Sequence, residues 1–342
     1  MRDQNMIAKK KTGCSINPNM TLVVSDAVRK YHHLPSRTLA RLLFAEHPTI
    51  GTVELFRNAI RQRRGTMGQL NRAKMRDRVE WNAEENKYRL PSSHARAWEP
   101  HVLTGVKSAL IIGDLHIPYH IPQAIEAAFE TGLKEKVDTI IVNGDAWDCH
   151  RMSRFLIDPK SARTEEEYES VLQFKDVLED VFPEAKVIWK IGNHDARLET
   201  YIAANVPEIA ALKIFRWEDV LHAGPNMVVV PHKKPIKMGD LWVLHGDEWR
   251  NTGTAVNPAR GAYLRVKECC IHMHNHQAVS HTETSISGRL VQVWSVGCCC
   301  ELHPYWLPIN NWMWGHAIVR MDSDGAFEVE NKKIVKGKVY PA

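Results

Sequence analysis

The sequence predicts an α/β core that follows a small, basic, all-α module. Three observations support this prediction. From residue 105 onward, short apolar runs typical of β-strands alternate with stretches rich in Ala, Leu, Glu and Lys that are typical of helices. Five of these apolar runs end directly in Asp, Asn or His. The first 100 residues instead show helical spacing and a large excess of Lys and Arg.

The length of the chain suggests roughly two domains. Its 342 residues are 44% hydrophobic and 25% charged, which excludes the collagen-like and low-complexity classes. No apolar run approaches the roughly 18 residues that cross a bilayer, and the first residues lack the apolar segment of a secretory signal. We expect a flexible tail at 1–20, a basic helical module at 21–66, a linker at 67–104 and the α/β domain at 105–342.

Three short helices joined by brief turns are expected in the basic module, an arrangement that resembles a helix-turn-helix. Capping residues and the positions of proline and glycine set their limits. The expected helices run from Ser25 or Asp26 to Lys30, from Pro35-Ser36 to His47-Pro48, and from Gly51 or Thr52 to Gly65. In the linker we expect one helix near 70–80, with Trp81 and Trp98 as docking anchors.

Positive charge is concentrated in the first part of the chain. Residues 1–100 hold 19 Lys and Arg against 9 Asp and Glu, whereas the other 242 residues hold 26 against 31. The third expected helix carries Arg57, Arg61, Arg63 and Arg64, of which the first two share a face. Such a module can bind DNA or RNA by neutralising phosphates. A solvated basic surface without a partner is the alternative.

The cysteines predict a reducing compartment. The chain has 7 cysteines, and five of them stand in two clusters, Cys269-Cys270 and Cys298–Cys300. Adjacent strand residues point to opposite faces, so we expect reduced thiols and a cytoplasmic protein. We interpret the second cluster as small buried hydrophobic residues at a strand end.

Polar side chains follow the five expected strands at the point where each strand ends. Because an α/β sheet binds its ligands beyond the carboxyl ends of its strands, these side chains are expected to share one site. Helices are expected over 122–135 and 165–182. The strands and their polar residues are 108–113 with Asp114 and His116, 137–144 with Asp145 and Asp148, 185–192 with Asn193, His194 and Asp195, 241–244 with His245 and Asp247, and 269–273 with His274 and His276.

These residue types predict a site for divalent cations. Neutral imidazole, carboxylate and amide oxygen suit Mn, Fe, Ni or Zn, and of these we favour Mn. A thiolate set for structural zinc is not evident. A carboxylate can bridge two ions, and two ions about 3.5–4 Å apart can clamp the entering and leaving oxygens of a phosphoryl transfer.

In this order, the five blocks resemble those of the calcineurin-like metallophosphoesterases, over roughly residues 105–310. The matching blocks are Asp114-x-His116, Gly144-Asp145-x-x-Asp148, Gly192-Asn193-His194-Asp195, His245-Gly246-Asp247 and His274-x-His276. The resemblance implies a four-layer α/β/β/α sandwich. With its basic helical segment, the chain is also similar to phosphoesterases carried by bacteriophages, which would place it in the host cytoplasm. Met273 stands where the family usually has glycine, and we expect this to be tolerated because both histidines keep their spacing.

The resemblance implies two divalent metal ions and a role for each matched residue. The first ion would be held by Asp114, His116 and His276, the second by Asn193, His245 and His274, and Asp145 would bridge the two. A hydroxide activated by both metals would attack phosphorus. His194 would donate a proton to the leaving oxygen or stabilise its charge, and Asp195 would orient His194. Asp148 and Asp247 would support the ligands from behind.

Several neighbouring residues keep two interpretations each. His150 is expected at the surface, with substrate contact as the alternative. Arg197 and Arg250 could bind phosphate or pair with a carboxylate. The tryptophans at 294, 306, 312 and 314 are expected to pack a sheet, although a Trp-rich rim could stack a base or a sugar.

The sequence therefore favours a metal-dependent hydrolase of phosphomonoesters or phosphodiesters. The basic module favours nucleic acid or a nucleotide as substrate, and so a phosphatase or a nuclease. One alternative is a nucleic-acid-binding protein that uses the phosphoesterase fold as a scaffold, which the intact set of metal-binding side chains disfavours. Another is a protein serine/threonine phosphatase, which the basic N-terminal segment disfavours.

Overall fold

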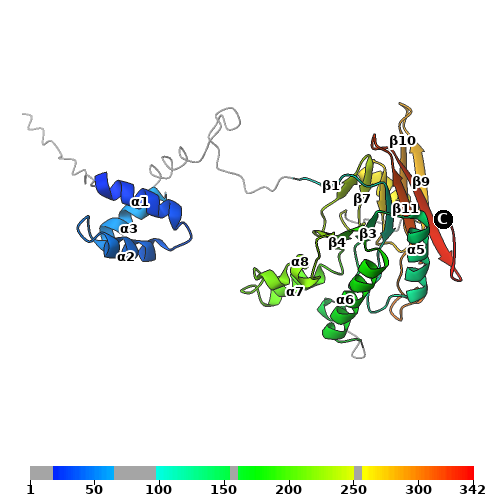
Figure 1. Cartoon of the computed structure of the whole chain (residues 1–342), viewed down its shortest axis with the longest axis horizontal. Helices are drawn as coiled ribbons and strands as arrows, with labels where there is room; N and C mark the ends of the chain where they lie inside the picture. Colours follow the sequence, from blue (N-terminus) through cyan, green and yellow to red (C-terminus); the bar gives the residue numbers. More distant parts are fainter. Residues whose placement is uncertain (1–17, 65–97, 155–160, 250–255) are drawn as a thin grey trace, which may run out of the picture. The chain divides into compact units, whose positions relative to one another are not determined.

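The computed structural model describes residues 18–64, 98–154, 161–249 and 256–342 (Figure 1). The chain divides into two compact units, Met1–Arg96 and Ala97–Ala342. Trp81, Arg250 and the helix expected near 70–80 lie outside the described residues. Among the helices that the structure describes, none has the length and the hydropathy that a membrane crossing requires.

The first unit contains the expected helices α1 (Pro18–Lys30), α2 (Ser36–Glu46) and α3 (Val53–Arg63). The Thr52 side chain accepts a hydrogen bond from the Leu55 N–H and so caps α3, as the sequence predicts. The expected start of α1 at Ser25 or Asp26 is wrong. The helix begins seven residues before Ser25, because Met20, Val24 and Ala27 form one buried stripe against α2 and α3.

The arginines of α3 differ in their surroundings. Arg64 donates to the backbone carbonyls of Tyr31 (3.1 Å) and Leu34 (2.7 Å), so its guanidinium joins the end of α1 to the start of α2. Arg57 pairs with Glu54 at 3.2 Å on the helix surface. These contacts give Arg64 a structural role within the unit, and phosphate binding by the arginines of this helix stays a prediction.

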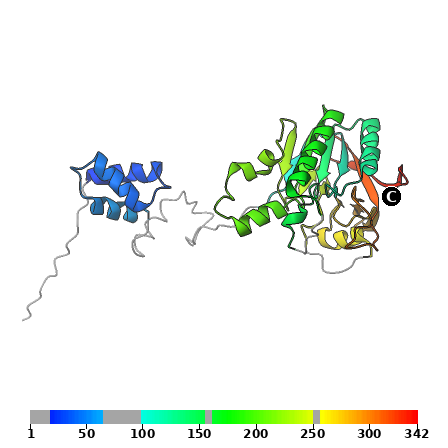
Figure 2. The same ribbon diagram turned by 90° about the horizontal axis from the view of Figure 1, so that it is seen from below.

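The second unit is built from two β-sheets with helices on both outer faces, which confirms the predicted four-layer sandwich. In Figure 2, the teal and green helices α5 and α6 lie above the strands and the yellow helix α9 lies below them. The helices are α5 (Pro122–Glu135), α6 (Thr164–Val181), α7 (Arg197–Asn205), α8 (Trp217–Val220) and α9 (Pro258–Val266), with 3₁₀ turns η1 (His150–Met152) and η2 (Lys213–Phe215). The expected helices over 122–135 and 165–182 correspond to α5 and α6.

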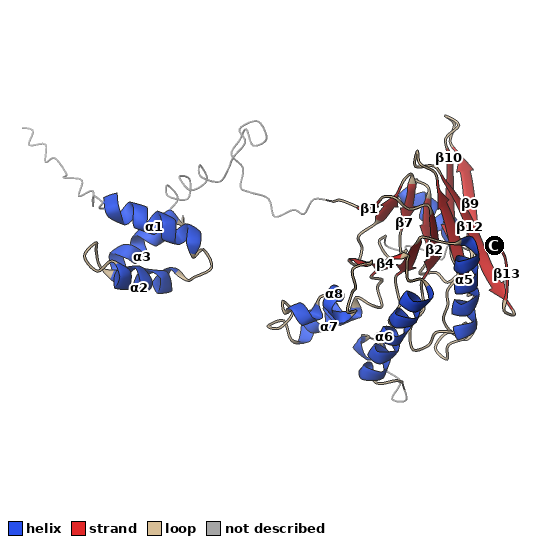
Figure 3. Cartoon of the chain, in the orientation of Figure 1, coloured by secondary structure: helices blue, strands red, loops and turns tan. Residues whose placement is uncertain are grey.

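The larger sheet has the strand order β13-β12-β11-β2-β3-β4-β5, and β2 to β5 are parallel. The smaller sheet has the order β1-β6-β7-β8-β10-β9. Figure 3 draws the strands of both sheets in red and the helices in blue. The larger sheet contains β2 (Ser108–Ile112), β3 (Thr139–Asn143), β4 (Lys186–Lys190), β5 (Met227–Val230), β11 (Trp314–Met321), β12 (Phe327–Val335) and β13 (Lys338–Pro341). The smaller sheet contains β1 (His101–Leu103), β6 (Ile236–Met238), β7 (Leu241–Val243), β8 (Cys270–His272), β9 (Val279–Thr284) and β10 (Leu290–Ser295).

Alternating side chains of the central strands fill two separate cores. In β2, Leu110 and Ile112 pack with the helices, whereas Ala109 and Ile111 face the other sheet. The strand is apolar on both faces because both faces are covered, which is why it reads as a continuous hydrophobic run. Residues 101–103 were expected in the linker but form β1, which pairs in parallel with β6.

Candidate metal centre

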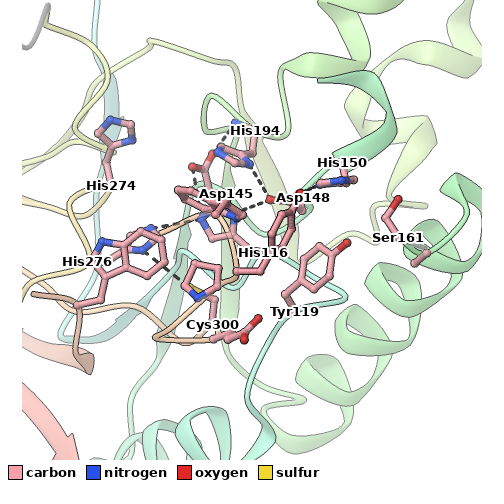
Figure 4. Close-up of a pocket in the computed structure, with 16 residues that line it drawn as sticks. His116, Tyr119, Asp145, Asp148, His150, Ser161, His194, His274, His276 and Cys300 are labelled. Atoms are coloured by element: carbon pink, nitrogen blue, oxygen red, sulfur yellow. Dashed lines mark hydrogen bonds and ion pairs between the residues drawn. The ribbon is translucent and has the colours of Figure 1, made fainter. Parts of the chain in front are cut away.

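The loops that follow β2, β3, β4, β7 and β8 meet at one edge of the two sheets and bring the expected ligands together (Figure 4). Two groups of possible metal donors share Asp145. One is Asp145 with His116 and His194, the other is Asp145 with His245 and His274, and within each group the donor atoms lie within 4.8 Å of one another. A carboxylate common to two donor groups is the arrangement that a bridging ligand needs.

Asp145 is buried between these groups. Its Oδ2 lies 3.2 Å from His245 Nε2 and 3.9 Å from His116 Nε2, and its Oδ1 accepts a hydrogen bond from the His194 backbone at 2.7 Å. Burial disfavours the charge, but His245 and His194 hold the pKa of Asp145 well below its usual value. The carboxylate is therefore ionised, as a metal ligand must be.

Backbone and carboxylate acceptors orient the histidines. The His245 Nδ1–H donates to the Asn143 carbonyl at 2.8 Å, and the His116 Nδ1–H donates to Asp148 Oδ1 at 2.8 Å. In both rings Nε2 then faces the site. Asn193 Oδ1 lies 3.2 Å from His245 Nε2. Metal-binding histidines are commonly fixed through their second nitrogen in this way.

Asp114, His116 and His276 have the features expected of a cation site. The two Nε2 atoms of His116 and His276 face each other at 3.3 Å, and Asp114 Oδ1 lies 3.7 Å from His276 Nε2. Within the described residues, this buried Oδ1 accepts no hydrogen bond. Burial raises the pKa of Asp114 to about 7, because its charge has too little compensation from the protein alone. A divalent cation fits this set of donors.

The backbone of the candidate ligands is strained. Asp114, His116, Asp145, His274 and His276 all have positive φ values, between 46° and 68°. This left-handed conformation is unfavourable for residues with a side chain and is concentrated at functional sites. Five of the seven expected ligands adopt it, so the fold holds these side chains in place against a local conformational cost.

His194 contacts a different carboxylate from the one expected. Its Nδ1–H donates to Asp148 Oδ1 at 2.7 Å, and its Nε2 accepts a hydrogen bond from Arg197 at 3.0 Å. The Asp195 carboxylate instead accepts the backbone N–H groups of Asp145, Trp147 and Gly192, each at 2.8 Å. The expectation that Asp195 orients His194 is wrong, because three backbone donors draw its side chain away from the imidazole.

The other supporting carboxylates stabilise the loop after β7. Asp247 Oδ2 lies 2.7 Å from His232 Nε2. Glu248, which the sequence did not single out, accepts the His245 and Gly246 backbone N–H groups at 2.9 and 2.7 Å. Met273 is buried in the core between the sheets. A Cβ at Gly113 would lie 2.7 Å from its sulfur, so that glycine provides the space for the larger side chain.

A pocket of about 320 Å³ opens beside the candidate ligands. His150 lines it with 16% of its side chain exposed, which favours substrate contact over a plain surface position. The sequence also did not single out Tyr119 and Cys300, which line the pocket, or Glu167, which is buried behind it and accepts the Trp147 indole N–H at 2.9 Å. Glu167 lies in a run of three glutamates on α6, and nothing in the sequence distinguishes the buried one.

Several solved structures are similar to part of this chain. The vacuolar protein sorting 29 protein (Vps29) of Cryptosporidium parvum is 14% identical, with a TM-score of 0.39, over 69% of this chain and 96% of that chain. Vps29 of Entamoeba histolytica, solved with Zn²⁺, is 14% identical, with a TM-score of 0.35, over 68% and 96%. The phosphoesterase YfcE of E. coli is 13% identical, with a TM-score of 0.35, over 64% and 96%.

No curated protein sequence matches the chain. The model of the calcineurin-like phosphoesterases matches residues 108–316, more than half of the 342 residues, and contains all five blocks. The chain therefore belongs to the calcineurin-like phosphoesterase family.

Proposed function

We propose that this chain is a phosphoesterase that uses two divalent cations. Asp114, His116 and His276 hold one of them, Asn193, His245 and His274 hold the other, and Asp145 contributes to both. The observation that carries this proposal is that Asp145 lies within donor distance both of His116 and His194 and of His245 and His274. Family membership supports metal-dependent hydrolysis of phosphate esters.

The cations, when bound, would polarise the phosphate ester and lower the pKa of water at the site. Mn²⁺ is our preferred ion because the donors are imidazole nitrogens and carboxylate and amide oxygens, although Fe, Ni and Zn suit the same donors. We propose a phosphomonoester or phosphodiester substrate of the nucleotide or nucleic-acid class.

His194 is the residue that we assign to the leaving oxygen. Asp148 accepts the Nδ1 proton, and the Arg197 guanidinium, which is always a donor, faces Nε2. Arg197 therefore brings positive charge beside the imidazole. When a phosphate ester binds, Arg197 can turn from Nε2 to the phosphate, and Nε2 of His194, carrying a proton, can donate to the leaving oxygen while Asp148 keeps the Nδ1 proton.

Turnover of a chromogenic monoester and a chromogenic diester with added Mn²⁺ tests this function. We expect turnover by the wild-type chain and by the control His281→Ala, which removes a histidine of β9 outside the site. His194→Ala should lower kcat by roughly 10²–10⁴-fold while metal content is retained. Asp145→Ala should lose both metal and turnover.

Two results would contradict the proposal. Equal kcat for the wild type and His194→Ala would refute the role of His194. A chain that retains no divalent cation and hydrolyses neither ester would refute the phosphoesterase function itself. That second outcome would favour the scaffold alternative.

A further inference from the structure

We propose that the loop from Glu301 to Met313 forms an aromatic subsite that binds the base of a mononucleotide while its phosphate lies at the metal centre. This inference rests on the function proposed above and adds the substrate class. It comes from the aromatic side chains of this loop, the shape of the pocket and the charge of its lining.

An aromatic wall begins at one of the candidate ligands and continues along the pocket. The Trp312 ring packs on the His276 ring with centroids 4.2 Å apart, and Trp306 packs on Trp312 at 5.6 Å. Trp306 and Tyr305 line the pocket with 58% and 68% of their surface exposed. Large aromatic surfaces that the chain leaves uncovered beside a site are typical of ligand contacts.

A second pair of aromatic rings also lines the pocket. Tyr119 and His150 line it and pack edge to face with centroids 5.9 Å apart, and Figure 4 shows both rings beside Asp148. The volume of about 320 Å³ lies at the small end of the range for ligand pockets. It suits a single ring with its sugar rather than several nucleotides.

The loop is held in shape by its own hydrogen bonds. The Asn310 side chain donates to the carbonyls of Leu302 and Leu307 at 2.6 and 2.9 Å and accepts the Trp312 backbone N–H at 2.8 Å. The Trp314 indole donates to the Cys300 carbonyl at 2.8 Å. A preformed wall loses little conformational entropy when a ring stacks on it.

The charge of the pocket lining favours a mononucleotide over a nucleic-acid strand as the ligand. Among the described residues that line the pocket, none is Lys or Arg, and Glu301 is also part of the lining. A strand presents several phosphates and is normally bound through several cationic side chains. A mononucleotide presents one phosphate, which the metal centre accepts, and an uncharged ring, which the aromatic wall accepts.

The ring can be tested without the phosphate. We expect metal-free protein to bind adenosine in equilibrium dialysis, and Trp306→Leu to weaken this binding about 5- to 140-fold, the range for loss of one stacked base. Trp306→Phe should lose less, because it keeps a ring. Trp98→Leu is the matched control, because Trp98 is 70% exposed and packs on Trp242, outside the pocket lining.

Turnover then tests the connection to the metal centre. Adenosine 5′-monophosphate and ribose 5-phosphate differ only in the base, so the ratio of their kcat/KM values measures what the ring contributes. This ratio should fall about 5- to 140-fold in Trp306→Leu and stay at the wild-type value in Trp98→Leu.

The outcomes distinguish the two proposals. Adenosine binding and a kcat/KM ratio that do not respond to Trp306→Leu would overturn the aromatic subsite and leave the phosphoesterase intact. Turnover of a polynucleotide with a higher kcat/KM than the mononucleotide would also overturn it. Failure to hydrolyse any phosphate ester would refute the proposed function. Equilibrium dialysis with adenosine would still test the aromatic subsite, because it does not depend on turnover.

Discussion

The buried ion pair of Lys190 and Glu248 connects the larger sheet to the loop that carries His245. Lys190 ends β4 and is fully buried, with Nζ 3.0 Å from Glu248 Oε1 and 2.9 Å from the Lys234 carbonyl. Burial disfavours the charge of Glu248, but Lys190 and the backbone donors hold its pKa below the usual value. We predict that removing one partner of this pair strongly destabilises the second unit.

The Lys190→Met substitution keeps most of the side-chain volume and removes the charge. Glu248 keeps its two backbone donors but loses its counter-ion, and loss of one partner from a buried pair costs about 3–5 kcal/mol. Native proteins are stable by only about 5–15 kcal/mol, so this is a large fraction of the total. Because the unpaired carboxyl would have a folded-state pKa above its unfolded value, the deficit should shrink as the pH falls toward about 5.

Urea unfolding followed by tryptophan fluorescence measures this effect. The described part of the helical unit contains no Trp, so among the described residues the signal comes from the second unit. Lys175→Met is the control, because Lys175 pairs with the more exposed Asp176 and Glu179, and we expect a loss below about 1 kcal/mol. The double variant Lys190→Met/Glu248→Gln should be more stable than Lys190→Met, since it removes the unpaired charge. Equal unfolding free energies for Lys190→Met and Lys175→Met, with no pH dependence, would refute the reasoning.

Three further predictions concern Arg64, Gly192 and Glu167. Arg64→Ala should destabilise the helical unit by about 1–3 kcal/mol, measured by hydrogen exchange of α1 to α3, whereas Arg57→Ala should change it by less than about 0.5 kcal/mol. Gly192→Ala should lower metal retention after dialysis, because the added methyl group would collide with Asp145. Burial raises the pKa of Glu167 to about 7. Its folded-state pKa lies above its unfolded value, so stability falls as the pH rises from about 4.5 to about 7, and Glu167→Gln should flatten the pH dependence of the urea midpoint over that range. A midpoint that varies with pH equally in both proteins would contradict this assignment.

Much of the second unit could be predicted because its signals are local. The apolar runs are continuous because both faces of the larger sheet are covered. The polar residues follow the strands because the site lies at the edge of the sheet where these strands end. The limits of α5 and α6 agree with the expected ranges to within one residue. The first helix was placed too late, because its buried stripe depends on packing against two other helices.

The contacts that the sequence could not supply are those between distant loops. Asp195 is adjacent to His194 in the sequence, but Asp148, 46 residues away, is its partner in space. Arg64 is similarly fixed by carbonyls 30 and 33 residues away. Such pairings depend on how loops cross at the sheet edge, and no spacing rule within one segment contains that information.

A glycine directly precedes three of the polar residues of the site. Gly113, Gly144 and Gly192 directly precede Asp114, Asp145 and Asn193, each at the end of a strand. A Cβ on any of them would meet a neighbouring loop: Met273 at the first, His245 at the second and Asp145 at the third. The glycines therefore allow the loops to close on one another, and this close approach brings the strained ligand residues into one site. The recurrence of glycine before the polar residue reflects the packing between loops as much as the turn of each loop.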